Sequence, residues 1–236
     1  MKSGSKKRIK QKGRMVEPEP FFPIPKFIAI QLSMVPDKER DKRTRDRIIA
    51  ASKRRFMEQG IQRTKIEEIV YDLGMSKRTF YRFFKNKTDL LEAVVAEIFS
   101  MLFPKLFSIF SNDEQATVKL KRYHNFLVEE LFRQVSLEFI ADLEVEAPFL
   151  WKEIYQTRMI LLQKMRSVIE EGQKSGQLRT DVDAGVVTGL IISIINQVGT
   201  PRGLVSLGLQ PSILADYLFK MFFEGLLRRD NMEERL

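Results

Sequence analysis

A short segment near residue 80 combines cationic side chains with hydrogen-bonding ones. Its members are Lys77, Arg78, Thr79, Tyr81 and Arg82. A guanidinium can donate two parallel hydrogen bonds to O6 and N7 of guanine, and the methyl group of a threonine can contact that of thymine. A phenol or an ammonium can donate to a phosphate oxygen. These residue types predict contact with both the bases and the backbone of double-stranded DNA.

Few residues of the chain suit catalysis or metal binding. The 236 residues include no cysteine and one histidine, His124. This composition excludes disulfides, thiolate metal sites, cysteine nucleophiles and zinc motifs that need two histidines. The run from Asp181 to Gly185 lacks the further acidic positions of a calcium loop, and no phosphate loop or dinucleotide fingerprint occurs. We therefore expect no enzyme, no metal and no cofactor.

Two short helices joined by a tight turn are predicted to position the basic side chains. The first helix should begin with Thr64 as its N-cap and end near Leu73, because Gly74 accepts a left-handed backbone. Ser76 should cap the second helix, which ends near Phe84. The apolar residues expected between the two helices are Ile66, Ile69, Val70, Leu73, Met75, Phe80 and Phe84. This arrangement is a helix-turn-helix, whose second helix enters the major groove.

The helices on either side of this pair follow from caps and breakers. One helix should span residues 42–59 and stop at Gly60. Asn86 should cap the next, which we expect to end near Phe103 because Pro104 disfavours a helix interior. Lys87 lies in the first turn of that helix, where an ammonium and backbone N–H groups can together bind a phosphate.

A basic face also has a simpler interpretation, which is an amphipathic helix pair with a solvated surface. In this segment, however, the caps, the turn and the basic face coincide. That combination favours DNA binding over a merely solvated surface.

Residues from about Arg45 to Val94 resemble the DNA-binding domain of the tetracycline-repressor (TetR) family of bacterial regulators. The matching residues are Ile48, Ile49, Ala51, Phe56, Gly60, Thr64, Ile69, Gly74, Ser76, Lys77, Thr79, Tyr81, Phe84, Lys87 and Leu90. The resemblance implies DNA contacts by Thr64, Lys65, Ser76, Lys77, Thr79, Tyr81 and Lys87, the last two on phosphates. Arg78 stands where the family often has glycine, and this difference bears on sequence preference.

The net charge of +9 is unevenly distributed along the chain. Residues 1–38 carry 9 basic and 3 acidic side chains, and residues 39–90 carry 15 and 8, whereas residues 91–236 carry 16 and 20. We expect three parts: a flexible basic extension at 1–38, the DNA-binding domain at 39–90, and an effector-binding and dimerisation domain at 91–236. Met15 and Met34 leave open that translation begins downstream, in which case this extension is an artefact of start assignment.

Beyond residue 90, apolar residues recur at spacings of three and four, so the expected fold class is all-α. Further helices are predicted at about 115–135, 136–146, 148–173, 182–199 and 211–229. Two of them are apolar nearly all round and need a partner. By resemblance to the family, they would form a four-helix bundle with a second copy of the chain. The residues expected in that homodimer interface are Val187, Ile191, Ile194, Ile195, Tyr217, Leu218, Met221 and Phe222.

The middle of the chain holds an unusual number of aromatic residues. They predict either an ordinary core or an apolar pocket for a small-molecule effector. The candidate pocket residues are Phe103, Phe107, Phe126, Phe139, Phe149 and Trp151. His124 could sense a ligand or pH, although a surface role suits it better, and Glu144, Glu146 and Glu153 could face a cationic effector.

We therefore expect a cytoplasmic, bacterial, homodimeric repressor that binds a palindromic operator and is released by a largely apolar ligand. An activator that needs its ligand remains open within the same family. A helical lipid-binding or membrane-surface protein with a basic end is the alternative from another class. The apolar stretch from Phe21 to Val35 is too short and too broken by proline to span a membrane, so no stable membrane association is expected.

Overall fold

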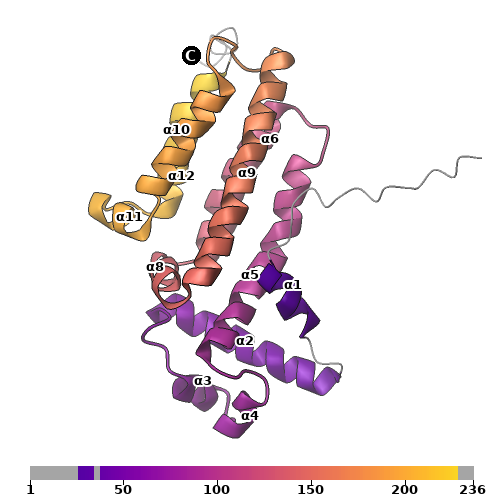
Figure 1. Cartoon of the computed structure of the whole chain (residues 1–236), viewed down its shortest axis with the longest axis vertical. Helices are drawn as coiled ribbons and strands as arrows, with labels where there is room; N and C mark the ends of the chain where they lie inside the picture. Colours follow the sequence, from indigo (N-terminus) through magenta and orange to yellow (C-terminus); the bar gives the residue numbers. More distant parts are fainter. Residues whose placement is uncertain (1–25, 35–37, 228–236) are drawn as a thin grey trace, which may run out of the picture.

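The computed structural model describes residues 26–34 and 38–227, and these form helices joined by short loops (Figure 1). The helices that include and flank the predicted DNA-binding segment are α1 (Lys26–Ser33), α2 (Glu39–Gln59), α3 (Ile66–Asp72), α4 (Lys77–Tyr81) and α5 (Lys87–Phe110). The following helices are α6 (Ala116–Asn125), η1 (Phe126–Leu131), α7 (Phe132–Gln134), α8 (Leu137–Glu146), α9 (Pro148–Lys174), α10 (Ala184–Gln197), α11 (Pro201–Leu207), α12 (Pro211–Leu218), η2 (Phe219–Phe223) and η3 (Glu224–Leu226). The expected all-α class is confirmed.

The predicted helix ends agree with the structure where a local cap decides them. Helix α2 ends at Gly60, whose φ of 85° lies in the left-handed region. Asn86 accepts a hydrogen bond from the backbone N–H of Asp89, and Asp183 accepts one from Val186. The acidic run before α10 is therefore a helix cap, as expected.

The predicted end of α5 near Phe103 is wrong. The helix continues through Pro104 to Phe110, although an interior proline removes a hydrogen bond and costs ~3 kcal/mol. Leu102 before the proline is buried, and so are Leu106 and Ile109 after it. Burying such side chains is worth about 1.5–3 kcal/mol each, which outweighs the cost. As a result α5 runs without a break across the expected domain boundary at residue 90.

Part of the extension expected to be flexible is helical. Helix α1 packs against α5 with Ile28 buried, and Gln31 donates to Glu92 at 3.2 Å. Arg45 of α2 in turn donates to Gln31 at 2.9 Å, and burial lowers the pKa of this arginine. The basic run at residues 6–14 lies outside the described residues. The charge-based reading missed α1 because its contacts come from helices distant in sequence.

The second half of the chain is a bundle in which α6, α8 and α10 pack on the long helix α9 (Figure 1). The helix expected at 115–135 is interrupted, because a π-helical turn from Phe126 replaces regular geometry. Similarly, the helix expected at 211–229 changes to π and then 3-10 geometry after Leu218. Helix α11 was not predicted, and it turns the chain by 84° relative to α10.

Two segments of the described residues meet the length and composition of a membrane span. They are α5 by itself, and α10 with α11 if the bent pair is taken together. Half of the apolar window of α5 is buried within the protein. The apolar character of α5 therefore has an explanation in packing, since α1, α2, α6 and α9 all contact it.

Gly172 provides a test of how closely α9 packs. A Cβ atom at this position would lie 2.7 Å from Cδ1 of Leu178 and 2.8 Å from Cβ of Ala116. Overpacking of this kind costs ~1–3 kcal/mol, against the ~1 kcal/mol that alanine gains over glycine in helix propensity. We expect Gly172→Ala to lower the free energy of unfolding, measured by urea denaturation. The exposed Ser167→Ala on the same helix should change it by less than ~0.5 kcal/mol, and a more stable Gly172→Ala variant would contradict this packing.

Candidate nucleic-acid interface and effector cavity

Helices α3 and α4 form the predicted helix-turn-helix. Gly74 takes a φ of 60°, and Met75 donates its backbone N–H to the carbonyl of Val70 at 3.0 Å. Ser76 begins α4, because its Oγ accepts a hydrogen bond from the N–H of Thr79 at 3.1 Å. The turn and the second cap are thus as the sequence predicted.

One side of α4 is anchored in the core and the other faces solvent. Phe80 and Phe84 are fully buried, with their ring centroids 5.8 Å apart. Arg78 lies on the exposed side, and Tyr81 is 48% exposed. The buried phenylalanines therefore fix the orientation in which α4 presents its polar side chains.

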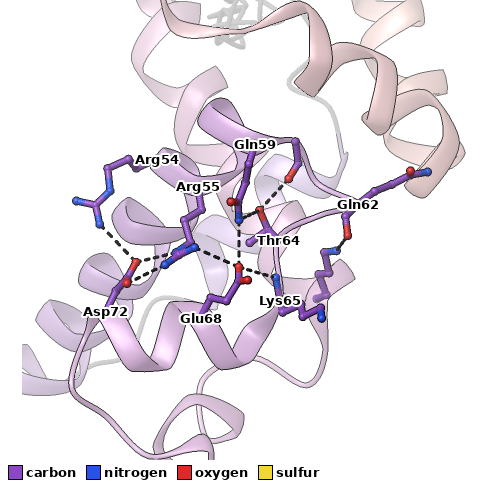
Figure 2. Close-up of polar contacts among 10 residues, drawn as sticks. Arg54, Arg55, Gln59, Gln62, Thr64, Lys65, Glu68 and Asp72 are labelled. Atoms are coloured by element: carbon purple, nitrogen blue, oxygen red, sulfur yellow. Dashed lines mark hydrogen bonds and ion pairs between the residues drawn. The ribbon is translucent and has the colours of Figure 1, made fainter.

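Arg55 ties α3 to α2, as Figure 2 shows. Its Nε donates to Asp72 at 2.7 Å, its Nη2 donates to the same carboxylate at 2.8 Å, and its Nη1 donates to Glu68 at 3.1 Å. The hydrogen bonds from Arg55 hold the pKa of Asp72 below its usual value. Gln59 also donates to Glu68 at 3.1 Å. These bonds fix the position of α3, and α4 packs on α3.

Two of the predicted DNA contacts are engaged in ion pairs within the chain. Lys77 lies 2.5 Å from Glu67, and this contact raises the pKa of the lysine and lowers that of the glutamate. Arg82 lies 2.7 Å from Asp41 at the start of α2, with its guanidinium over the ring of Phe83. The side chains of Lys77 and Arg82 are both more than half exposed, so a competing anion can reach them.

Thr64 was expected to cap α3 and to contact DNA, and the structure agrees with neither expectation. It is 1% exposed, and its hydroxyl donates to the carbonyl of Gly60 at 2.8 Å. Helix α3 begins two residues later, with Lys65 at the cap position, where its N–H donates to Glu68 at 3.4 Å. The side chain of Thr64 therefore stabilises the loop between α2 and α3 instead of facing solvent.

The remaining candidate residues lie near this loop and the α3–α4 turn. Lys65 is exposed, and the half-buried Lys87 donates to the carbonyl of Gln62 at 3.4 Å. The hydroxyls of Ser76 and Thr79 hydrogen-bond to each other at 2.9 Å. Of the candidates, Lys65, Ser76, Lys77, Arg78, Tyr81 and Arg82 are exposed, Thr79 and Lys87 are half-buried, and Thr64 alone is buried.

A cavity of about 290 Å³ lies inside the second half of the chain. Four of the six predicted pocket residues line it, namely Phe103, Phe126, Phe139 and Trp151. Phe107 and Phe149 are 39% and 46% exposed and do not line it. Because aromatic residues lie on several faces of these helices, their spacing in the sequence could not show that Phe107 and Phe149 point away from the cavity.

Two basic side chains reach the cavity wall. His124 lies 3.2 Å from Asp216 and stacks on Phe219 with the ring centroids 4.3 Å apart. Arg158 lines the cavity from α9, which the sequence reasoning did not anticipate. The sequence could have indicated this position, because Arg158 lies one helical turn after Ile154 and one before Leu162. Both of these apolar residues also line the cavity. None of Glu144, Glu146 and Glu153 lines it.

Helix α8 joins this cavity to the DNA-binding half. Ile140 and Leu143 line the cavity, and Asp142 between them accepts a hydrogen bond from the N–H of Gln62 at 2.9 Å. Gln62 belongs to the loop that leads into α3. Helix α8 therefore both lines the cavity and bonds to the loop that leads into α3.

The predicted dimer residues divide between two faces. Val187, Ile191 and Leu218 are buried within the chain, and Ile191, Ile195 and Leu218 line the cavity. Tyr217 and Met221 are 58% and 67% exposed, whereas Ile194 and Phe222 are half-buried. The exposed apolar side chains of α10 and α12 are Val186, Leu190, Ile213 and Tyr217. We name these exposed side chains, together with the exposed Met221 of η2, the α10–α12 face.

These features define a class of protein: a regulator with an N-terminal helix-turn-helix and a helical domain that encloses a cavity. Comparisons with known proteins agree. Residues 48–94 match the family model described as bacterial regulatory proteins, tetR family. The matched segment is therefore similar to the DNA-binding domain of this family, and the chain is a DNA-binding transcriptional regulator.

Relatives of known sequence or structure match over most of the chain. The uncharacterized HTH-type transcriptional regulator YdgC of Bacillus subtilis (strain 168) is 22% identical over 194 residues, which is 82% of this chain and 98% of that protein. A Saccharomonospora viridis protein solved in complex with choline has a TM-score of 0.62 at 21% identity, covering 79% of this chain and 99% of that one. The regulator FadR from Bacillus subtilis, in complex with stearoyl-CoA, has a TM-score of 0.53 at 18% identity over 76% and 98%. The two structures share the fold of this chain.

Arg55→Met tests the attachment of α3. Because the folded protein lowers the pKa of Asp72, the pair stabilises the fold above the unfolded pKa of ~4, and this contribution is lost as the pH falls through the folded value. We expect the stability difference from wild type to be large at pH 7 and to shrink towards pH 3, measured by urea unfolding. Arg54→Met, whose contact to Asp72 is 3.6 Å and more exposed, should show a smaller effect. Equal effects of the two variants would contradict the role of Arg55.

Proposed function

We propose that this regulator is a homodimeric repressor that a small-molecule effector releases from a palindromic DNA site in the bacterial cytoplasm. The observation that supports it best is the contact between Asp142 and Gln62, because α8 both lines the cavity and bonds to the DNA-binding half. Solved structures of the same fold hold choline in one case and stearoyl-CoA in another. A ligand in this cavity would be surrounded by side chains of α5, α8 and α9.

The exposed side of α4 has the residues that DNA recognition needs. Arg78 forms no ion pair among the described residues and is the side chain we assign to a guanine edge. Tyr81 and Lys65 are exposed and suit phosphate contacts, as does Lys87. Lys77 and Arg82 would exchange Glu67 and Asp41 for phosphates of the DNA backbone, which carries one negative charge per ~1.7 Å of helix axis.

A dimer would follow from the α10–α12 face. Val186 and Leu190 are exposed one turn apart on α10. Tyr217 of α12 and Met221 of η2 are likewise exposed and four residues apart. Apolar side chains in such a row are typical of a helix surface that packs on another. A two-fold dimer would place two reading helices ~34–36 Å apart, one turn of DNA.

Release would require an effector that binds one spacing of the reading helices better than the other. Changing DNA-competent occupancy from 99:1 to 1:99 takes a difference of ~5.5 kcal/mol between the two conformers. In our proposal, α8 transmits that difference, because a shift of Leu143 at the cavity wall displaces Asp142 and with it the loop at Gln62.

Arg78→Ala and Tyr81→Phe test the interface on α4. We expect Arg78→Ala to cost ~1–3 kcal/mol on the preferred site and little on random DNA, because it removes a base contact. Tyr81→Phe should weaken binding to the preferred site and to random DNA by a similar free energy, ~0.5–1.5 kcal/mol, since it removes one phosphate contact. The measurement is fluorescence anisotropy with a site selected from a random pool. Equal losses of affinity on both DNAs for Arg78→Ala would rule out its base contact.

The effector distinguishes a repressor from a ligand-dependent activator, because it should lower the DNA affinity of the former and raise that of the latter.

Leu190→Asp tests the dimer. Placing a carboxylate on the α10–α12 face buries a charge in the proposed interface, so we expect the dimer to dissociate at least tenfold more readily in sedimentation equilibrium. Val205→Asp is the control, because Val205 is 69% exposed on α11 and lies outside that face. A wild-type chain that is monomeric at micromolar concentration would overturn the dimer.

A further inference from the structure

The cavity contains a cation that lacks a counter-ion. The guanidinium of Arg158 donates from Nη2 to Oδ1 of Asn196 at 3.2 Å and lies 5.2 Å from the ring centroid of Tyr155. Its Nε is buried and has no hydrogen-bond partner, and no ion pair to Arg158 occurs within residues 26–34 and 38–227. Burial lowers the pKa of this arginine. A guanidinium has five N–H donors, so Arg158 keeps unused capacity at the cavity wall.

The other basic side chain at the wall, His124, already has a partner. Nε2 of His124 lies 3.2 Å from Asp216, whose carboxylate also accepts a hydrogen bond from Lys220 at 2.8 Å. An anion brought to His124 would meet the charge of Asp216. Arg158 is therefore the place at which the cavity favours negative charge.

The rest of the wall is apolar. Besides aromatic residues such as Phe139 and Trp151, aliphatic side chains such as Leu102 and Leu162 line it. No aspartate or glutamate does so among the described lining residues, so a cationic ligand would find no carboxylate partner. One guanidinium balances one negative charge, and a second charge would remain unpaired in apolar surroundings at a high cost.

We propose that the cavity binds an amphipathic carboxylic acid, with its carboxylate on Arg158 and its apolar body against the aromatic and aliphatic wall. The proposal rests on the proposed function in that it takes this cavity as the effector site. A carboxylate matches the planar fork of a guanidinium with two parallel hydrogen bonds. The amide of Asn196 and the ring of Tyr155 contact the guanidinium and orient it.

The experiment uses the full chain and its one tryptophan, Trp151, which lines the cavity and reports binding through its fluorescence. The probes are decanoate, 1-decanol and decylammonium, which share an apolar body and differ in charge. We expect decanoate to bind at least tenfold more tightly than decanol, and decylammonium most weakly. Arg158→Met should remove the preference for decanoate while leaving the affinity for decanol within about twofold.

Arg166→Met is the matched control, because this arginine lies on α9 but pairs with Glu170 on the surface. It should leave all three affinities unchanged. Arg158→Lys keeps the charge without the fork and should retain part of the preference, which keeps the test valid if Arg158→Met fails to fold. Circular dichroism checks the fold of each variant.

Several results would overturn the proposal. They are equal affinities of the wild type for decanoate and decanol, a decanoate preference that survives Arg158→Met, or no binding of any probe. Loss of dimerisation in Arg158→Met with an unchanged preference would assign Arg158 to the interface instead. DNA affinity is measured separately. Arg158-dependent binding of decanoate that leaves DNA affinity unchanged would support the acid site while contradicting ligand-relieved repression.

Discussion

The structure depends on the continuous apolar face of α5. Near its start, Leu90 and Val94 are buried where α5 packs on α2, and from Val95 onward the same helix lines the cavity. One hydrophobic core runs through both halves of the protein, and α5 contributes to it along its length. Because packed interiors leave few voids and resist deformation, this helix links the positions of the two halves. The DNA-binding half and the cavity are therefore parts of one mechanical unit, even though their sequences differ in charge.

Polar contacts set the orientation of the elements around that helix. Arg45 and Gln31 bond α2 to α1, and Asp142 bonds α8 to the loop at Gln62. Each of these hydrogen bonds joins two separate elements, and its directional geometry restricts how the two elements lie relative to each other. The apolar core supplies most of the stability, whereas these bonds select among the arrangements that the core would allow.

The sequence predicted those features that depend on neighbours along the chain. The caps at Ser76, Asn86 and Asp183 involve a side chain and a backbone N–H three residues later, so spacing is sufficient to find them. The predictions that failed concern positions where distant contacts outweigh local preference. Pro104 stays within a helix because buried leucines flank it, and Thr64 turns inward to the carbonyl of Gly60.

Residue types and their order were enough to indicate the helical class, the helix-turn-helix and its basic surface. They could not say which side of an all-apolar helix meets the core, because periodicity carries no information when every face is hydrophobic. Packing alone separated the inward Ile191 and Leu218 from the outward Leu190 and Met221. It also brought Arg158 of α9 to an apolar cavity whose described lining residues include no carboxylate, since that environment is assembled from helices far apart in the chain.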